Sequence, residues 1–206
     1  MVPGYSPDRS GAPDRLLARH GGTLLRVALD SIGHGLAHGT QLGVDLARYP
    51  PVLCAEHASF VTLMVAGKLR GCIGKSRACN PLVADVAENA FAAAFEDTRF
   101  AALTSAEVDD IDVKVSVLSD PEPLRFTGET DLLSRLRPGI DGVILECGSL
   151  HGVFLPDVWQ TLPEPRDFLS NLKVKAGMRS DYWSTEMTAL RFTTASTSLS
   201  APSGTD

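Results

Sequence analysis

Residues 68–76, KLRGCIGKS, bring together the residue types that most clearly suggest chemistry in this sequence. Side chains alternate along a strand, so Arg70 and Cys72 are expected on one face, with Gly71 and Gly74 beside them. A cationic neighbour favours the thiolate, which is the nucleophilic form of cysteine. Glycine allows a ligand or another backbone to approach closely. The stretch therefore predicts Cys72 as a candidate nucleophile; the alternative is a buried cysteine beside an arginine in a structural salt bridge.

The same stretch does not fit a phosphate-binding loop of the Walker type. That motif requires a glycine five residues before the glycine of Gly-Lys-Ser. Here Gly74 begins the Gly-Lys-Ser triplet and Leu69 occupies the required position. Gly67 and Gly71 are both out of register, so the phosphate-loop interpretation is set aside.

Three other segments supply candidate binding residues. In EDTRF, Asp97 and Arg99 could line a pocket together with Arg70, but a turn in which Asp97 hydrogen-bonds the backbone is the favoured alternative. Ser116 lies on the outward side of the strand IDVKVSVLS, where a solvated face is the favoured interpretation. Lys175 lies near the C-terminus of a predicted helix, where a cation is favoured whatever its function.

Strands and helices are needed to position these residues. The segment SFVTLMVAGKLRGCIG is typical of two strands joined by a tight turn. Asn80 is expected to cap the next helix, with Pro81 at its first position. The strict alternation of IDVKVSVLS predicts a half-buried antiparallel strand. The other expected elements are a helix from near Thr23, a hairpin over 142–156 that turns at Gly148, a helix over about 166–176 and a last strand over 189–194.

This succession of elements indicates the fold class and the domain organisation. Strand pairs with helices between them indicate an α+β fold, with a mostly antiparallel sheet flanked by helices. Residues 1–20 are predicted to be a flexible leader and 21–193 the folded domain. Residues 194–206 are predicted to be a disordered tail, because they are rich in Ser, Thr, Ala, Pro and Gly.

The composition excludes several classes of function. The formal net charge of −6 and the lack of a basic run disfavour a nucleic-acid binder. No apolar run is long enough for a membrane helix, and no secretory signal is seen, so a cytoplasmic location is expected. The histidines show no metal-site spacing, and no metal is predicted. The four cysteines form no C-x-x-C pair and are expected to be reduced thiols; they are Cys54, Cys72, Cys79 and Cys147.

Several segments, in this order, resemble the AMMECR-type domain family. LRGCIG is that family's hallmark and is intact here. The resemblance covers about residues 22–192. Its segments are FVTLMVAGKLRGCIG, PL before an alanine-rich helix, DTRF, VSVLS, GIDGVIL, HGVFLPDV and FLSNLKVKAG, followed by Trp183.

The resemblance implies one α+β domain with a smaller subdomain, and a cleft between the two parts that the LRGCIG strand lines. It also implies a role like that of the first component of the AmmeMemoRadiSam system, whose partners are Memo-type and radical SAM proteins. Lys173 occupies a position that often holds cysteine in the family, which weakens a two-thiol mechanism here. The site residues that the resemblance carries over are Cys72, Arg70, Gly71, Gly74, Asp97, Arg99, Ser116 and Lys175.

Two functions of different classes follow from this pattern. The first is a cysteine-dependent enzyme or enzyme component acting on a small anionic substrate, with Cys72 as reactive thiol and Arg70 as anion holder, since arginine binds carboxylate and phosphate through two parallel hydrogen bonds. The second is a non-catalytic module that binds a ligand or a partner. Binding of nucleotide or RNA is disfavoured by the negative charge, and no particular cofactor is indicated.

Overall fold

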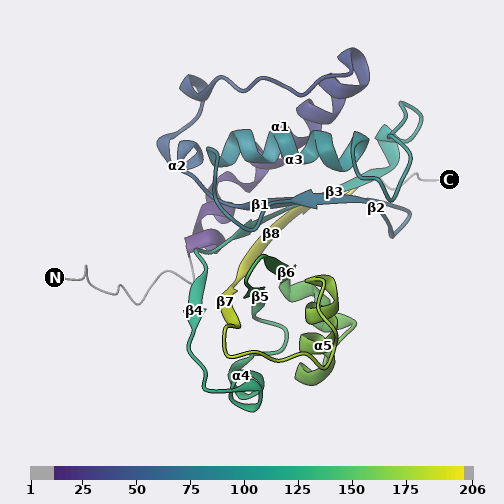
Figure 1. The fold of residues 1–206 in the computed structure, drawn as a ribbon. Helices are drawn as coiled ribbons and strands as arrows, with labels where there is room; N and C mark the ends of the chain where they lie inside the picture. The colour runs from purple at the N-terminus through teal and green to yellow at the C-terminus, as the bar shows by residue number, and fades with distance from the viewer. Residues whose placement is uncertain (1–11, 202–206) are drawn as a thin grey trace. The chain divides into compact units, whose positions relative to one another are not determined.

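The chain folds into two compact units, each with its own sheet and core. A computed structural model describes residues 12–201 (Figure 1). The first unit contains the chain up to Leu118 and the segment from Ala195 onward, and the second contains Ser119–Thr194. Each sheet has four strands, and helices accompany both. The predicted α+β class is confirmed, with two antiparallel sheets in place of one.

The sheet of the first unit has the strand order β2-β1-β3-β8. Strand β1 (Ser59–Val65) pairs antiparallel with both β2 (Lys68–Gly74) and β3 (Ile111–Leu118). The β1–β2 hairpin turns at Ala66 and Gly67, whose φ angles are 50° and 73°. Two successive positive φ angles match the twist of the flanking strands, so the predicted tight turn is confirmed. Because β2 is an edge strand, one of its sides has no neighbouring strand.

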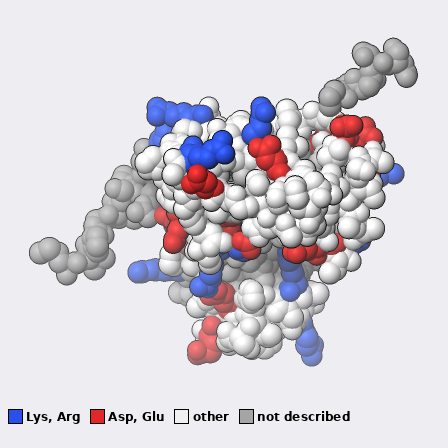
Figure 2. Space-filling model, turned by 90° about the horizontal axis from the view of Figure 1, so that it is seen from above, with Lys and Arg blue, Asp and Glu red and all other residues white. Residues whose placement is uncertain are grey.

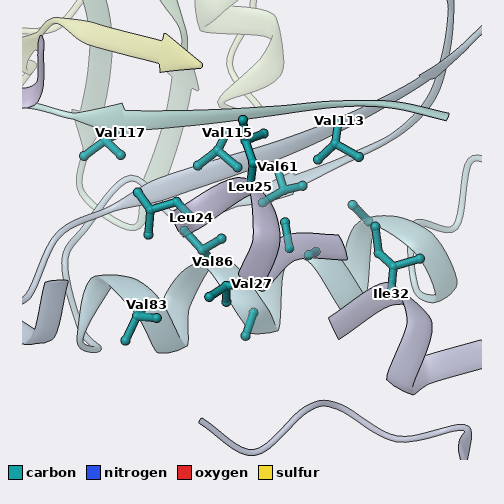
Figure 3. Packing of buried hydrophobic residues seen from close by; sticks show 14 of the residues in the cluster. Leu24, Leu25, Val27, Ile32, Val61, Val83, Val86, Val113, Val115 and Val117 are labelled. Atoms are coloured by element: carbon teal, nitrogen blue, oxygen red, sulfur yellow. The ribbon is translucent and has the colours of Figure 1, made fainter. Parts of the chain in front are cut away.

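Two long helices pack on one face of this sheet (Figure 1). They are α1 (Ala12–His38) and α3 (Leu82–Phe95), and α3 lies against β1 and β2. The buried alanines of α3, Ala87, Ala90, Ala93 and Ala94, let its axis lie close to the sheet. Figure 3 shows the core that results, built from Leu24, Leu25, Val27 and Ile32 of α1, Val61 of β1, Val83 and Val86 of α3, and Val113, Val115 and Val117 of β3.

Helix starts differ from the sequence predictions. Helix α1 begins at Ala12 rather than near Thr23, because Leu16 and Leu17 extend its buried stripe by two more turns. The part of the expected leader from residue 12 onward is therefore helical, and residues 1–11 lie outside the described residues. Helix α3 begins at Leu82, one residue later than predicted, and Asn80 donates to Glu88 instead of capping the helix.

The expected disordered tail contains a strand, which corrects the prediction for residues 194–199. Strand β8 (Thr194–Leu199) joins the first sheet beside β3. Ala195 is buried in the core, and the hydroxyl of Ser196 hydrogen-bonds that of Ser116 at 2.8 Å. A Cβ on Gly21 would lie 3.0 Å from Thr197 Oγ1, so α1 also approaches this strand closely. The small polar side chains that suggested disorder here belong to a partly buried strand. Residues 202–206 lie outside the described residues.

The second unit contains the sheet β4-β7-β5-β6. The predicted hairpin and last strand are present as β5 (Gly142–Cys147), β6 (Leu150–Phe154) and β7 (Thr188–Phe192). The predicted helix is α5 (Pro165–Lys175). Its C-cap residue is Ala176, and Gly177, whose φ is 84°, follows the cap. There Gly177 N–H donates to Val174 and Met178 N–H to Lys173, the Schellman pattern.

Short elements complete both units. In the second unit, the indole of Trp159 stacks on Phe168 with ring centroids 3.8 Å apart, and Trp159 Nε1 donates to the Asp141 carbonyl. The sequence analysis did not identify β4 or α4 of this unit. The remaining elements are η1 (Leu46–Arg48), α2 (Pro51–Cys54), η2 (Val108–Asp110), β4 (Glu122–Leu124), α4 (Glu129–Arg135) and η3 (Pro156–Gln160).

We expect Gly71→Ala to destabilise the protein and Gly33→Ala to leave it equally or more stable. A Cβ on Gly71 would overlap the Ala93 carbonyl oxygen, so the substitution forces α3 away from β2 and costs about 1–3 kcal/mol. A Cβ on Gly33 meets nothing within 4 Å inside α1, where alanine is preferred to glycine by about 0.5–1 kcal/mol. Urea denaturation midpoints of the two variants give the comparison. Equal midpoints would show that the packing of α3 on β2 does not require position 71 to lack a side chain.

Candidate functional site

Cys72 lies on the edge strand β2, opposite Thr62 of β1. Its thiol is half-buried, and the Thr62 hydroxyl donates a hydrogen bond to Cys72 Sγ at 3.3 Å. The neighbouring Gly71 faces the backbone of α3, so Cys72 projects from the opposite face of the sheet. Sγ is therefore held as a hydrogen-bond acceptor on the face that α3 does not cover.

The backbone of Cys72 is bound on its open side by Asp97 and Arg99. Cys72 N–H donates to Asp97 Oδ2 at 2.9 Å, and Arg99 Nη2 donates to the Cys72 carbonyl at 3.1 Å. Arg99 also donates to both oxygens of Asp97, at 2.9 Å from Nε and 2.7 Å from Nη2. These two side chains satisfy the backbone groups that an edge strand leaves unpaired. We call this arrangement of Asp97, Arg99 and the Cys72 backbone the edge clamp.

Charge reinforces the edge clamp. The carboxylate of Asp97 is buried, while the guanidinium of Arg99 is about half exposed. The hydrogen bonds from Arg99 outweigh the effect of burial and, with the Cys72 N–H, hold the pKa of Asp97 well below its usual range. The hydrogen bond to Asp97 raises the pKa of Arg99; burial opposes this effect and the charge of Asp97 adds to it. Asp97 is therefore ionised across the physiological range and is unsuited to act as a general base.

Arg70 is engaged by a different carboxylate. Its Nε and Nη2 donate to Glu107 at 2.8 and 3.2 Å, and its Nη1 donates to the Ala101 carbonyl at 2.9 Å. The hydrogen bonds from Arg70 and from Thr104 lower the pKa of Glu107 to about 2. Arg70 thus ties the loop after the edge clamp to β2. Its role as an anion holder stays a prediction, and these contacts do not support it, because an incoming anion would compete with Glu107.

The two glycines of the site are explained by contacts within the first unit. A Cβ on Gly71 would overlap the Ala93 carbonyl, and one on Gly74 would overlap the ring of Phe60 and the carbonyl of Ser59. The lack of a side chain at Gly71 therefore lets α3 pack closely on β2, and at Gly74 it leaves room for Phe60 and the Ser59 carbonyl. Their assignment as ligand-binding residues stays a prediction.

Ser116 and Lys175 differ from the residues around Cys72. Ser116 is buried and hydrogen-bonded to Ser196, so the prediction that this position lies on a solvated face is wrong. Lys175 belongs to the second unit, where its Nζ lies 5.1 Å from the centroid of the Phe154 ring. The structure therefore brings Cys72, Asp97 and Arg99 into direct contact, while a grouping of Lys175 with Cys72 stays a prediction.

Sequence reasoning missed several polar partners. Thr62 could have been found from the register of the predicted hairpin, whereas Glu107 gave no signal because it lies in a loop. In the second unit, Lys173 is fully buried, with Nζ 2.6 Å from Glu129 Oε1 and 5.6 Å from the centroid of the Trp183 ring. This chain therefore has, at position 173, an ion pair between a buried lysine and a partly exposed glutamate.

All four cysteines are free thiols. Among residues 12–201, no cluster of His, Cys, Asp and Glu could hold a metal ion. None of the helices in this described part is both long and apolar enough to cross a membrane.

Comparison with known proteins supplies the family. The profile of the AMMECR1 family matches residues 25–197, a range that includes the LRGCIG strand and the edge clamp. The chain belongs to the AMMECR1 family. The resemblance inferred from the sequence is therefore confirmed.

AMMECR1 relatives of similar length occur in archaea. A protein of Methanothermobacter thermautotrophicus is 39% identical over 178 residues, covering 84% of this chain and 90% of that protein. A protein of Methanocaldococcus jannaschii is 34% identical over 180 residues, covering 84% and 86%. The crystal structure of the uncharacterized protein PH0010 from Pyrococcus horikoshii superposes with a TM-score of 0.82 at 30% identity, covering 91% of this chain and 95% of that one.

We expect Asp97→Asn to destabilise the folded protein by about 1.5–3 kcal/mol near neutral pH, the usual worth of hydrogen bonds to a charged group. Because the folded pKa of Asp97 lies below its unfolded value of 3.8, this stabilisation is present above that pH and is lost as the pH falls through the folded pKa. Urea denaturation of both proteins across a pH series should give curves that converge in acid.

The exposed pair of Arg179 and Asp181 provides the matched control. It has the same spacing along the chain, but both side chains are solvent-exposed. Asp181→Asn should leave the midpoint nearly unchanged at every pH. An equal loss from Asp181→Asn, or a gap for Asp97→Asn that persists in acid, would contradict the edge clamp as a source of stability.

Proposed function

We propose that this AMMECR1 protein is a cysteine-dependent enzyme, or a component of one, that acts on a small anionic substrate with Cys72 as its reactive thiol. The observation that carries the proposal is the contrast between the backbone of Cys72 and its side chain. Both backbone groups of Cys72 are fixed by the edge clamp, while its Sγ accepts a hydrogen bond from Thr62 and is partly accessible. A rigidly held, accessible sulfur is suited to nucleophilic chemistry.

Arg99 is the cation best suited to meet the anionic group of the substrate. Its guanidinium is about half exposed and lies against the backbone of Cys72. Arg70 is less suited, because Glu107 and two loop carbonyls already occupy its donors. In this proposal Arg99 stabilises the thiolate and the substrate anion by charge, and Arg70 acts by fixing the loop.

A non-catalytic module that binds a ligand or partner is the second candidate. It is favoured by the edge clamp itself, since the charges of Asp97 and Arg99 are used to hold β2 and the loop together. In that case the hallmark strand presents a fixed surface and Cys72 undergoes no reaction. Binding of nucleotide or RNA fits less well, because Lys and Arg are interspersed with Asp and Glu on the face seen in Figure 2.

The proposed setting follows from the family resemblance. We place the protein in the cytoplasm, where its free cysteines stay reduced, in a pathway with Memo-type and radical SAM partners. The test of this proposal concerns Cys72 alone and involves neither partner.

We expect Cys72 to react with iodoacetamide faster than Cys54 and Cys147 in the folded protein, as read by peptide mass spectrometry. Cys79 is exposed and reports ordinary thiol reactivity. Arg99→Gln should slow labelling of Cys72 by roughly fivefold, the factor expected from an exposed charge interaction of about 1 kcal/mol. Phosphate or succinate should protect Cys72 while leaving Cys79 unprotected.

Asp97→Asn is the matched control, because it weakens the edge clamp but keeps the charge of Arg99. If both substitutions slow Cys72 equally, the effect comes from loss of structure and electrostatic activation is wrong. If Cys72 stays inert until the protein unfolds, the reactive-thiol proposal is wrong, and the binding module becomes the better account. Protection by anions with no slowing in Arg99→Gln would leave Cys72 reactive but reassign the anion contact.

A further inference from the structure

A cavity of about 550 Å³ lies in the first unit where β2 ends. It is lined by α3, by the end of β2, and by the chain that follows α1; the residues used below are Gln41, Ile73, Lys75, Glu88, Phe91 and Glu96. Its size is in the range of pockets that hold small molecules. Gly71 faces α3 on the side of the sheet where this cavity opens, whereas Cys72 projects from the other side. The cavity is therefore separate from the site of the proposed function.

A buried carboxylate lies behind the cavity wall, next to the lining residue Lys75. Asp85 is fully buried, and its Oδ2 accepts hydrogen bonds from Ser59 N–H, Ser59 Oγ and Asn89 Nδ2 at 3.0, 2.6 and 2.9 Å. Its other oxygen, Oδ1, accepts no hydrogen bond from any residue in the described range. That oxygen is directed at Lys75, whose Nζ lies 3.8 Å away in the cavity wall. A buried carboxylate oxygen without a donor costs free energy unless a cation compensates for it.

Lys75 already acts as an internal cation at this position. Its Nζ lies 2.7 Å from Glu88 Oε1 as well as 3.8 Å from Asp85 Oδ1. Burial opposes the charge on Lys75, but the hydrogen bond to Glu88 and the charges of Glu88 and Asp85 raise its pKa overall. Burial raises the pKa of Asp85. The two carboxylates therefore create a place that favours an ammonium group.

The remaining charges around the cavity have the same sign. Glu96 lines it from the end of α3, and the C-terminal end of the long helix α1, which carries negative partial charge, lies at Gly39. Lys75 pairs with Glu88 and Asp85, and Glu96 adds a further negative charge to the cavity wall. Phe91 and Ile73 add apolar surface, and an aromatic face also attracts cations.

The geometry points to this cavity as a binding site for a small organic dication, a diamine with one ammonium group at Glu88 and the other at Glu96, about two helical turns further along α3, and with its carbon chain against Phe91 and Ile73. An anionic ligand fits poorly, because Lys75 is the only cation among the described residues of the cavity wall, and Glu88 and Asp85 already neutralise it. The amide of Gln41 supplies a polar contact at the rim.

Putrescine and succinate, a cation and an anion of equal chain length, test this inference with the full chain. Each is titrated at low salt while backbone amide shifts are followed by NMR. We expect putrescine, with a dissociation constant of about 1 mM or tighter, to shift the amides of residues 73–75 and 88–96, and succinate to leave them unchanged. Glu88→Gln should weaken putrescine binding by about fivefold or more, because a carboxylate is lost and Lys75 is left less neutralised.

Two further variants make the test specific. Lys75→Met removes the competing internal cation, so it should tighten putrescine binding, the opposite of its effect on an anion site. Glu186→Gln, an exposed glutamate outside the cavity, should change nothing. Glu96→Gln should weaken putrescine binding in a protein that keeps Lys75. The test therefore still holds if Lys75→Met fails to fold.

Each contrary result overturns the inference. Succinate binding that Lys75→Met abolishes would make the cavity an anion site. Putrescine shifts that are the same in the wild type, Glu88→Gln and Glu96→Gln would show nonspecific charge attraction. Shifts by neither probe would show that the cavity takes no small charged ligand. None of these results bears on Cys72, so the proposed function is tested separately.

Discussion

The open edge of β2 is the constraint on which the first unit depends. An edge strand exposes N–H and C=O groups that must find partners or attract another chain. At Cys72 both groups are satisfied by Asp97 and Arg99, which come from the segment directly after α3. One segment therefore ends the helix, closes the edge of the sheet and fixes the backbone of the cysteine. Loss of any of these three would disturb the other two.

The hallmark sequence LRGCIG works because its alternate residues serve opposite faces. Gly71 faces α3 and must lack a side chain, since Ala93 leaves it no room. Arg70 and Cys72 face away from α3, where Arg70 binds Glu107. Gly71 and Arg70 thus have structural roles, whereas the sulfur of Cys72 stays partly accessible. This is the physical argument for giving Cys72 the chemical role.

Local patterns allowed much of this fold to be predicted, and long-range contacts account for what was missed. The hairpin at Ala66 and strand β3 follow from turn residues and alternation, which act over a few positions. Helix α3 was also predicted, starting one residue too early because Asn80 does not cap it. The start of α1 and the strand β8 depend on burial against distant elements, so composition alone misassigned them. The partner of Arg70 lies 37 positions along the chain, in a loop without a pattern, so the sequence could suggest an ion pair but could not identify Glu107.

Buried charge distinguishes the two faces of the first sheet. Beside Cys72, two carboxylates are each paired with an arginine: Asp97 with Arg99 and Glu107 with Arg70. On the α3 side, Asp85 and Glu88 share one lysine, and an oxygen of Asp85 lacks a hydrogen-bond donor among the described residues. A balanced site resists a new ion, whereas an underneutralised one is stabilised by a cation. Ligand charge should therefore differ between the faces, and the exposed part of Arg99 is the contact that an anion near Cys72 would use.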